Sequence, residues 1–316
     1  IRGAYNLISS LEKEKREKGI VCASAGNHAQ GVALSCSTLK TKGVIYMPEQ
    51  TPKQKVSKVR YFGGEFVEIR LIGRTFDECS SEAVNFCEEN KMTYVPPFDD
   101  YKVMAGQGTV ALEILEDLDD VDTCVVPIGG GGLVAGLSTY FKEVSPSTTI
   151  VGVEPNGAPA MERSLKEGEV IELSEIDTFV DGAAVKKVGR LTFATAKDLI
   201  DQMVLTPEGQ VCSEMIEFYQ KDGIVTEPAG ALSASALYWI RDKIKGKKVV
   251  SVVSGGNKEK TRNPEIIEKS LIYQGLKHYF LVEFLQKPGE LRNFLDNILG
   301  PNDDITLFEY VKKTIY

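Results

Sequence analysis

The amino-acid sequence predicts an α/β protein in which parallel sheets are flanked by helices. Short apolar runs typical of buried strands alternate with longer amphipathic runs typical of helices, and glycine-rich turns follow several of the strand-like runs. This alternation indicates βαβ units. Of the 316 residues, 42% are hydrophobic and 26% charged, so the chain can bury a large core without disulfides or metals.

The first hundred residues predict a small α/β unit. Apolar residues recur on one face of 3–19, and Gly19 ends this first predicted helix. Compact apolar runs predict three strands, at 19–23, 43–47 and 65–71. Helical periodicity between and after them predicts three more helices, at 27–43, 51–64 and 75–91.

A second α/β series follows. Its predicted strands are 123–128, 149–155 and 247–254, and its predicted helices are 106–118, 133–144, 215–224 and 230–244. The pattern changes near residue 277. There the sequence predicts a separate βαβ piece with a strand at 278–284, a helix at 291–299 and a strand at 305–313.

Charge and cysteine usage narrow the class of protein. There are 37 basic and 45 acidic residues, a net charge of −8, which argues against nucleic acid as a partner. The six cysteines are scattered without a C-x-x-C pair, so we expect no structural zinc, no disulfide framework and a cytoplasmic location. No apolar run approaches the roughly 20 residues of a membrane helix, and no signal peptide is recognisable, so we expect no membrane partner.

The strongest local signal is VVPIGGGGLVAG at 125–136. Gly129, Gly130, Gly131 and Gly132 follow a predicted buried strand, and a helix is predicted from Leu133. Consecutive glycines expose backbone N–H groups, and a helix start adds partial positive charge, so this turn predicts a phosphate cradle.

Two other phosphate-binding loops have related patterns. A P-loop is excluded because no Gly-Lys-Ser/Thr follows. A dinucleotide fingerprint stays open, since Gly130, Gly132 and Ala135 fit G-x-G-x-x-A. Glu154 then ends the next strand, where a ribose-binding acid belongs.

Two further turns carry polar residues at strand ends: SAGNHAQG at 24–31 and SVVSGGN at 251–257. A helix opening at TEPAGA adds Glu227. Ligands of open α/β sheets bind at strand carboxyl ends, so the three turns together predict a pocket.

Single residues of these turns also have plain structural interpretations. His28 fits the first turn of a helix, although we favour the pocket edge, and Ser254 fits a helix N-cap. Glu227 fits a helix cap equally well, and Glu154 ends a strand.

Ten motifs, taken together, resemble the fold-type II pyridoxal-phosphate enzymes, and within them the threonine dehydratase (threonine ammonia-lyase) family. They occur in the family's order: RGAYN at 2–6, SAGNHAQG at 24–31, MPEQTPKQK at 47–55, PPFDD at 96–100, GQGT at 106–109, GGGG at 129–132, GVEP at 152–155, DGAAV at 181–185, EPAGA at 227–231 and SGGN at 254–257. The region after 277 resembles the start of the ACT-like regulatory domain of biosynthetic threonine dehydratases.

The resemblance implies a two-domain fold-type II enzyme plus a truncated ACT-like βαβ segment. Residues 1–14 and 101–276 would form the large cofactor-binding domain, 15–100 the small domain, and 277–316 the partial regulatory domain.

The resemblance also implies roles for the turn residues. The family pattern gives the cofactor phosphate to Gly129, Gly130, Gly131, Gly132 and Leu133. It gives the cofactor ring to Asn27, Glu227 and Ser254, and the substrate carboxylate to Ser24, Ala25, Gly26, Asn27 and His28.

Two departures from the family pattern matter. The Schiff-base lysine of the family lies two residues before the Arg of RGA, so here it would directly precede Ile1. No catalytic lysine lies in this chain, and we expect this stretch alone to be inactive. The acid that accompanies the Glu of GVEP in metal-binding relatives is replaced by Ala160, so we expect no metal.

The implied function is β-elimination of L-threonine to 2-oxobutanoate and ammonia with pyridoxal 5'-phosphate, for isoleucine biosynthesis, under feedback by isoleucine as effector. A homo-oligomer, dimer or tetramer, is expected. Two alternatives stay open: a serine dehydratase or racemase of the same fold, and a non-catalytic cofactor-binding homologue.

Overall fold

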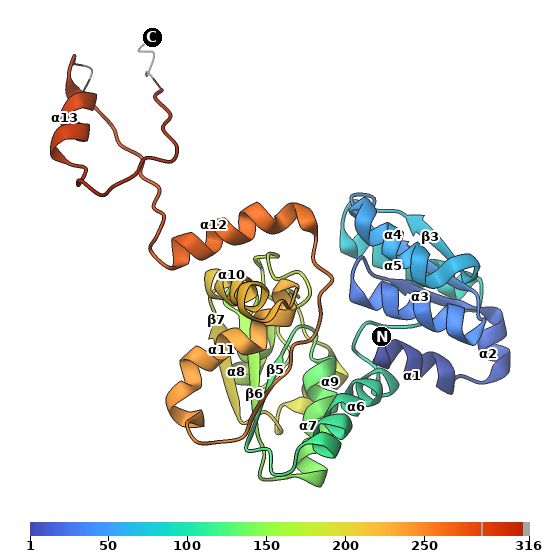
Figure 1. The fold of residues 1–316 in the computed structure, drawn as a ribbon. Helices are drawn as coiled ribbons and strands as arrows, with labels where there is room; N and C mark the ends of the chain where they lie inside the picture. The colour runs from blue at the N-terminus through green and yellow to red at the C-terminus, as the bar shows by residue number, and fades with distance from the viewer. Residues whose placement is uncertain (286, 312–316) are drawn as a thin grey trace. The chain divides into compact units, whose positions relative to one another are not determined.

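The computed structural model describes residues 1–285 and 287–311, which divide into a unit at 1–276 and a unit at 277–316 (Figure 1). The first unit contains two four-stranded sheets, and every strand pair in them is parallel. Helices cover both sheets (Figure 1). The α/β prediction is therefore confirmed for this unit.

The first sheet has the strand order β3-β2-β1-β4. Its strands are β1 Ile20–Ala23, β2 Gly43–Met47, β3 Val67–Leu71 and β4 Thr93–Tyr94. Its accompanying helices are α1 Arg2–Ser10, α2 Lys13–Lys18, α3 Asn27–Leu39, α4 Lys53–Gly63, the short 3-10 helix η1 Gly64–Phe66 and α5 Phe76–Glu89. Alternate residues of β1 enter opposite cores: Ile20 packs with α3 residues, and Val21 packs with α5 residues.

The second sheet has the strand order β7-β6-β5-β8. Its strands are β5 Thr123–Pro127, β6 Thr149–Pro155, β7 Gln202–Thr206 and β8 Val249–Ser251. Its helices are α6 Tyr101–Asp117, α7 Gly132–Val144, α8 Ala160–Glu167, α9 Arg190–Ala196, α10 Glu208–Glu217, the π-helix η2 Phe218–Asp222, α11 Pro228–Ile244, the 3-10 helix η3 Lys260–Arg262 and α12 Asn263–Tyr273. The carboxyl ends of β1, β5 and β8 lead into the three turns singled out above.

Glycines bring α6 and α7 into backbone contact. A Cβ built on Gly136 of α7 would lie 2.2 Å from the carbonyl oxygen of Met104 in α6. A Cβ on Gly108 of α6 would lie 2.9 Å from the carbonyl oxygen of Gly136. Because α7 begins at the tetraglycine turn, this close packing fixes where that turn sits.

The helix predicted over 3–19 is two helices. The chain is extended at Leu11, between α1 and α2. Ser9 and Ser10 donate hydrogen bonds to the carbonyls of Asn6 and Leu7, which is the competition by which serine weakens a helix end. Leu11 then packs into the core beside β1, and this contact outweighs helical periodicity.

The βαβ prediction for the second unit needs correction. The described part of that unit contains the helix α13 Glu290–Asn297 but no strand, so the strands predicted at 278–284 and 305–311 are not formed. Residues 312 and 313 of the latter lie outside the described residues. Leu281 and Leu307 are exposed, at 103% and 68%. A strand needs a partner for its backbone N–H and C=O groups, and apolar alternation alone does not supply one.

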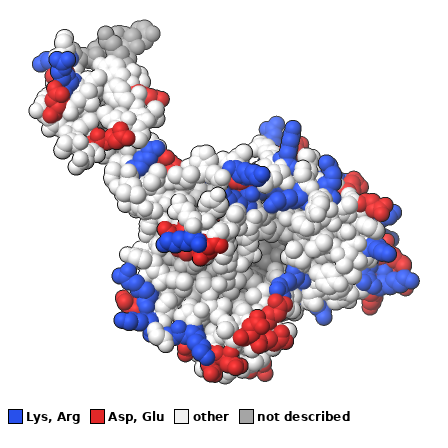
Figure 2. All heavy atoms as spheres, in the orientation of Figure 1, with Lys and Arg blue, Asp and Glu red and all other residues white. Residues whose placement is uncertain are grey.

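No helix in the described part of the chain is long and apolar enough to cross a membrane. On the face of the first unit in Figure 2, acidic and basic side chains are interspersed. That face is also hollowed between the part built on β5–β8 and the part built on β1–β4 (Figure 2).

Candidate active site

The tetraglycine turn is a set of unpaired backbone donors. It joins the end of β5 to α7, whose first residue is Gly132, and Gly131 has a φ of +92° that favours glycine. Among the described residues, nothing accepts a hydrogen bond from the N–H groups of Gly129 to Gly132. The start of α7 adds its own free N–H groups and partial positive charge. The turn therefore has the chemistry of an anion cradle.

Phe98 packs tightly beneath this turn. A Cβ on Gly130 would lie 2.2 Å from Cδ1 of Phe98, and one on Gly132 would lie 2.9 Å from the Phe98 Cβ. No side chain larger than hydrogen fits at either position. Both glycines are thus required by close approach, and the aromatic ring supports the cradle from below.

Thr192 and Asp99 also hold the turn, and the sequence alone gave neither of them a role. The Thr192 hydroxyl, fully buried, donates to the carbonyl oxygen of Gly130 at 2.7 Å. Asp99 accepts from the N–H groups of Arg190 at 3.1 Å and Leu191 at 2.8 Å, and so caps α9, which carries Thr192. In the motif PPFDD, a local signal exists only for Asp100, which caps α6; the contact of Asp99 with α9 spans 91 positions and has no local signal.

Asn27 and Glu227 join the second turn to α11. The Asn27 amide donates from Nδ2 to Oε1 of Glu227 at 2.7 Å, across 200 positions of sequence. A Cβ on Gly255, in the third turn, would lie 2.6 Å from that same oxygen. Two of the three turns therefore meet at one carboxylate, as the pocket prediction requires.

The tetraglycine turn reaches this carboxylate through one further segment. A Cβ on Gly129 would lie 3.0 Å from Cα of Ala183, and one on Gly182 would lie 3.8 Å from Oε1 of Glu227. The segment 182–183 thus lies between the phosphate cradle and the Asn27–Glu227 pair. All three turns are brought together in the structure.

Burial raises the pKa of Glu227, and the negative charge of Asp181 adds to that rise. The hydrogen bond from Asn27, the N–H of Asn257 and the charge of Lys55 oppose it. Glu227 is the N-cap residue of α11, but its side chain makes no capping bond there. Its carboxylate instead orients the Asn27 amide.

Ser24, Gly26 and His28 also have defined hydrogen-bond partners. Ser24 accepts at Oγ from the N–H of Gly26 at 3.1 Å and so shapes the second turn. Nε2 of His28 lies 2.9 Å from the carbonyl oxygen of Val95, and burial lowers the His28 pKa to about 4. The ring is half-buried and is a neutral structural partner of the strand end.

The remaining predicted residues, Ala25, Leu133 and Ser254, make one side-chain hydrogen bond between them. Ala25 packs against the core beside β1, and Leu133 packs against the core beside α7. Ser254 is exposed, and its hydroxyl donates to the carbonyl oxygen of Ala229 at 3.3 Å. No helix begins at Ser254, so the N-cap interpretation is wrong.

Glu154 has a structural role. It is fully buried, and its two carboxylate oxygens accept from the N–H groups of Met161 at 2.7 Å and Glu162 at 2.9 Å. Burial raises its pKa to about 8, against the effect of these two bonds. The dinucleotide interpretation therefore loses its ribose-binding acid. Within the described ranges, no three His, Cys, Asp or Glu side chains gather as a metal site.

Comparison with known families decides the class. The family described as pyridoxal-phosphate dependent enzyme matches residues 1–255, and the C-terminal regulatory domain of threonine dehydratase matches residues 268–314. The chain belongs to the pyridoxal-phosphate dependent enzyme family. In this family the cofactor carries a phosphate, and the unpaired N–H groups of Gly129 to Gly132 fit that anion.

Relatives of this pyridoxal-phosphate dependent enzyme are similar over most of its length. The biosynthetic L-threonine dehydratase IlvA of Halalkalibacterium halodurans is 54% identical over 314 residues, which cover 99% of this chain and 76% of the relative. The processed form of threonine deaminase isoform 2 from Solanum lycopersicum has a TM-score of 0.82 at 42% identity, over 85% of this chain and 78% of that chain. Serine racemase from Dictyostelium discoideum has a TM-score of 0.75 at 32% identity, over 82% of both chains.

Proposed function

We propose that this protein is an L-threonine dehydratase that converts L-threonine to 2-oxobutanoate and ammonia in isoleucine biosynthesis. The observation that carries the proposal is the meeting of an anion cradle with the Asn27–Glu227 pair. It occurs in a chain 54% identical to a relative named biosynthetic L-threonine dehydratase. Bound pyridoxal phosphate would supply an electron sink that acidifies the substrate Cα–H and lets the β-hydroxyl depart.

The chain's own residues would bind and orient the reactants. Gly129 to Gly132 and Leu133 would hold the cofactor phosphate by backbone N–H groups, and Ser254 would lie at the ring. Asn27, oriented by Glu227, would donate its second amide hydrogen to the ring's oxygen. In the stretch Ser24 to His28, the backbone N–H groups of Ala25, Asn27 and His28 would bind the substrate carboxylate at the start of α3. The N–H of Ser24 already donates to the carbonyl oxygen of Tyr46 at 3.0 Å, and that of Gly26 donates to Ser24 Oγ, so these two residues would shape the turn.

In the full-length protein, we propose that a lysine joined to Ile1 binds the cofactor covalently and moves the Cα proton. The structure supports a place for it beside α3, because a Cβ on Gly31 would lie 3.2 Å from the Ile1 nitrogen. The residue on that nitrogen would therefore emerge one turn from Asn27.

The test uses the full-length protein with pyridoxal phosphate and either L-threonine or L-serine, and follows release of the 2-oxo acid. We expect 2-oxobutanoate from threonine at the higher kcat/KM, and none when the lysine before Ile1 is changed to alanine. Preference for serine would favour the serine dehydratase or racemase alternative, which the likeness to serine racemase keeps in view. No cofactor binding would contradict the proposal.

We further propose that isoleucine, bound by the region that matches the regulatory domain, lowers activity, in a dimer or tetramer located in the cytoplasm. The match at residues 268–314 supports the regulation. The six free, buried thiols support a reducing compartment. Isoleucine should inhibit the full-length protein but not one that ends at Leu276. Inhibition that survives this truncation would contradict the assignment, and light scattering would give the oligomeric state.

A further inference from the structure

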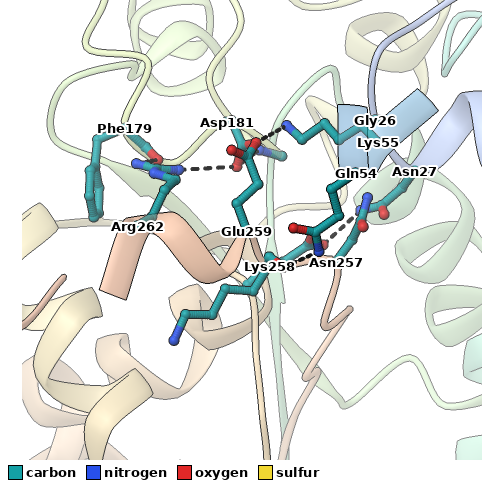
Figure 3. A network of polar contacts seen from close by, with 12 residues as sticks. Gly26, Asn27, Gln54, Lys55, Phe179, Asp181, Asn257, Lys258, Glu259 and Arg262 are labelled. Carbon is teal, nitrogen blue, oxygen red and sulfur yellow. Dashed lines mark hydrogen bonds and ion pairs between the residues drawn. The ribbon is translucent and has the colours of Figure 1, made fainter. Parts of the chain in front are cut away.

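A cluster of charges links α4 to the loops of the second sheet (Figure 3). Lys55 of α4 contacts Asp181 at 2.8 Å and Glu259 at 3.1 Å, and its side chain is only 13% exposed. Arg262 lies 3.8 Å from the other oxygen of Asp181. Lys55 is therefore a nearly buried cation shared by two carboxylates from different loops.

Burial disfavours the charge on Lys55, but Asp181 and Glu259 outweigh it. The pKa of Lys55 lies above its ordinary value because both carboxylates accept hydrogen bonds from it and attract its charge. Removing one partner of such a pair leaves the others uncompensated, which costs more than the loss of an exposed ion pair. This cluster is thus a strong candidate for a fixed link.

Two neighbouring residues of α4 reinforce the same link. Lys58 donates to the Asn257 side chain at 2.6 Å, and Gln54 donates to the carbonyl oxygen of Lys258 at 3.3 Å. Three contacts therefore join one face of α4 to residues 257–259, which begin with the last residue of the SGGN turn. The helix α3, which begins at Asn27, packs against α4.

The link also reaches the Asn27–Glu227 pair. Asp181 raises the pKa of Glu227 and Lys55 lowers it, so the two charges act on Glu227 in opposite directions. Without Lys55, Glu259 would lose its cation and Asp181 would keep only Arg262 at 3.8 Å, so more negative charge would face this buried carboxylate. The position of Lys55 therefore affects both the spacing and the charge around the site.

We propose that Lys55 is a positioning residue that, by pairing with Asp181 and Glu259, fixes α3 and α4 over residues 254–259 and thereby holds the Asn27 amide on Glu227. In this role Lys55 acts through its two carboxylate partners. Its effect on substrate rests on the function proposed above, whereas its effect on the loop does not.

The test is hydrogen exchange of the full-length, cofactor-loaded enzyme without substrate. Lys55→Met should speed exchange about tenfold at three hydrogen-bonded amides beside the link, the loss of about 1.4 kcal/mol of local stability. They are those of Glu227, which donates to Gly255, of Asn257, which donates to Glu227, and of Gln30 in the first turn of α3, which donates to Gly26. Lys53→Met, an exposed lysine of the same helix, is the matched control and should change nothing. Exchange in β6 should stay as in the wild type, which a general loss of stability would not allow.

A second variant guards against misfolding of the first. Asp181→Asn should speed exchange at the same amides, and the double variant should exceed the larger single effect by little, because both remove one interaction. Equal behaviour of Lys55→Met and Lys53→Met, a matching rise in β6, or additive effects in the double variant would overturn the proposal.

Kinetics separate this inference from the proposed function. Lys55→Met should raise the KM for L-threonine roughly tenfold while cofactor content stays that of the wild type. An unchanged KM would count against the positioning role at the site. If the wild-type enzyme itself left threonine unchanged, the proposed function would fail, while the exchange data would still decide the role of Lys55.

Discussion

Replacing Thr192 by valine tests whether the tetraglycine turn is held from outside. Valine has nearly the shape of threonine but carries a methyl group in place of the hydroxyl, which donates to the Gly130 carbonyl at 2.7 Å. The substitution places a methyl group where the oxygen was, closer to the carbonyl than carbon and oxygen normally approach. The turn must therefore shift by several tenths of an ångström.

The expected cost follows from the remaining partners. A buried hydrogen bond contributes about 0.5–1.5 kcal/mol net, and an orphaned acceptor costs about 1–3 kcal/mol. The Gly130 carbonyl keeps one donor, the N–H of Gly189 at 3.1 Å, so it is not orphaned. We expect Thr192→Val to lower the free energy of unfolding by about 1–2 kcal/mol. The affinity for pyridoxal phosphate should fall about tenfold, because the donors no longer converge.

The assay is urea unfolding followed by circular dichroism, together with a cofactor titration followed by absorbance. Thr139→Val is the matched control, since that hydroxyl is exposed and bonds only the Ala135 carbonyl within α7. Its effect should stay within about 0.5 kcal/mol. If Thr192→Val matched this control in both measurements, the clamp on the cradle would be refuted.

Three further changes have defined expectations. Gly130→Ala places a Cβ 2.2 Å from Cδ1 of Phe98. Bound cofactor, measured by absorbance, should fall more than about tenfold, and the free energy of unfolding in urea should fall by about 2 kcal/mol. Cofactor content equal to that of the wild type would contradict the packing argument. Gly136→Ala places a Cβ 2.2 Å from the carbonyl oxygen of Met104, so α7 must move away from α6. The free energy of unfolding should fall by about 2 kcal/mol, although alanine has the better helix propensity. An unchanged urea unfolding midpoint would show that α6 and α7 can separate at little cost. Burial holds the pKa of His28 near 4, below the value of about 6.5 in an unfolded chain. The unfolded state therefore binds the proton more tightly, and stability should fall by up to about 3 kcal/mol between pH 6.5 and 4, a loss that His28→Gln should remove in unfolding experiments across this range.

Local patterns in the sequence predicted most of the first unit. The apolar runs around β1, β2, β5 and β6 are buried strands because continuous apolar runs suit sheets covered on both faces. The run around β8 also forms a strand, but this strand lies at the sheet edge and is only half-buried. The strand β7 was not predicted, since QMVLT is short and preceded by a region with little periodicity. The helices α8 and α9 were missed for the same reason.

Local patterns failed where packing or pairing decides. Apolar alternation predicted strands in the second unit, yet no strand forms in its described residues, because a strand requires a paired neighbour. The single helix expected over 3–19 breaks at Leu11, which packs into the core. The periodicity of a segment by itself predicts neither the missing strands nor the break at Leu11.

The sequence by itself determined the parallel α/β architecture and the three turns at strand ends, because periodicity and glycine placement act over a few residues. Its motifs also carried the resemblance to a family that the comparisons confirm. Only the tertiary structure decided which residues of these turns contact one another and which other residues hold them in place. Asn27 meets Glu227 across 200 positions, Thr192 holds Gly130, and Lys55 is shared by Asp181 and Glu259. These contacts join residues that are distant in the chain. Local sequence patterns therefore cannot predict them, because only folding and burial bring these charges and donors together.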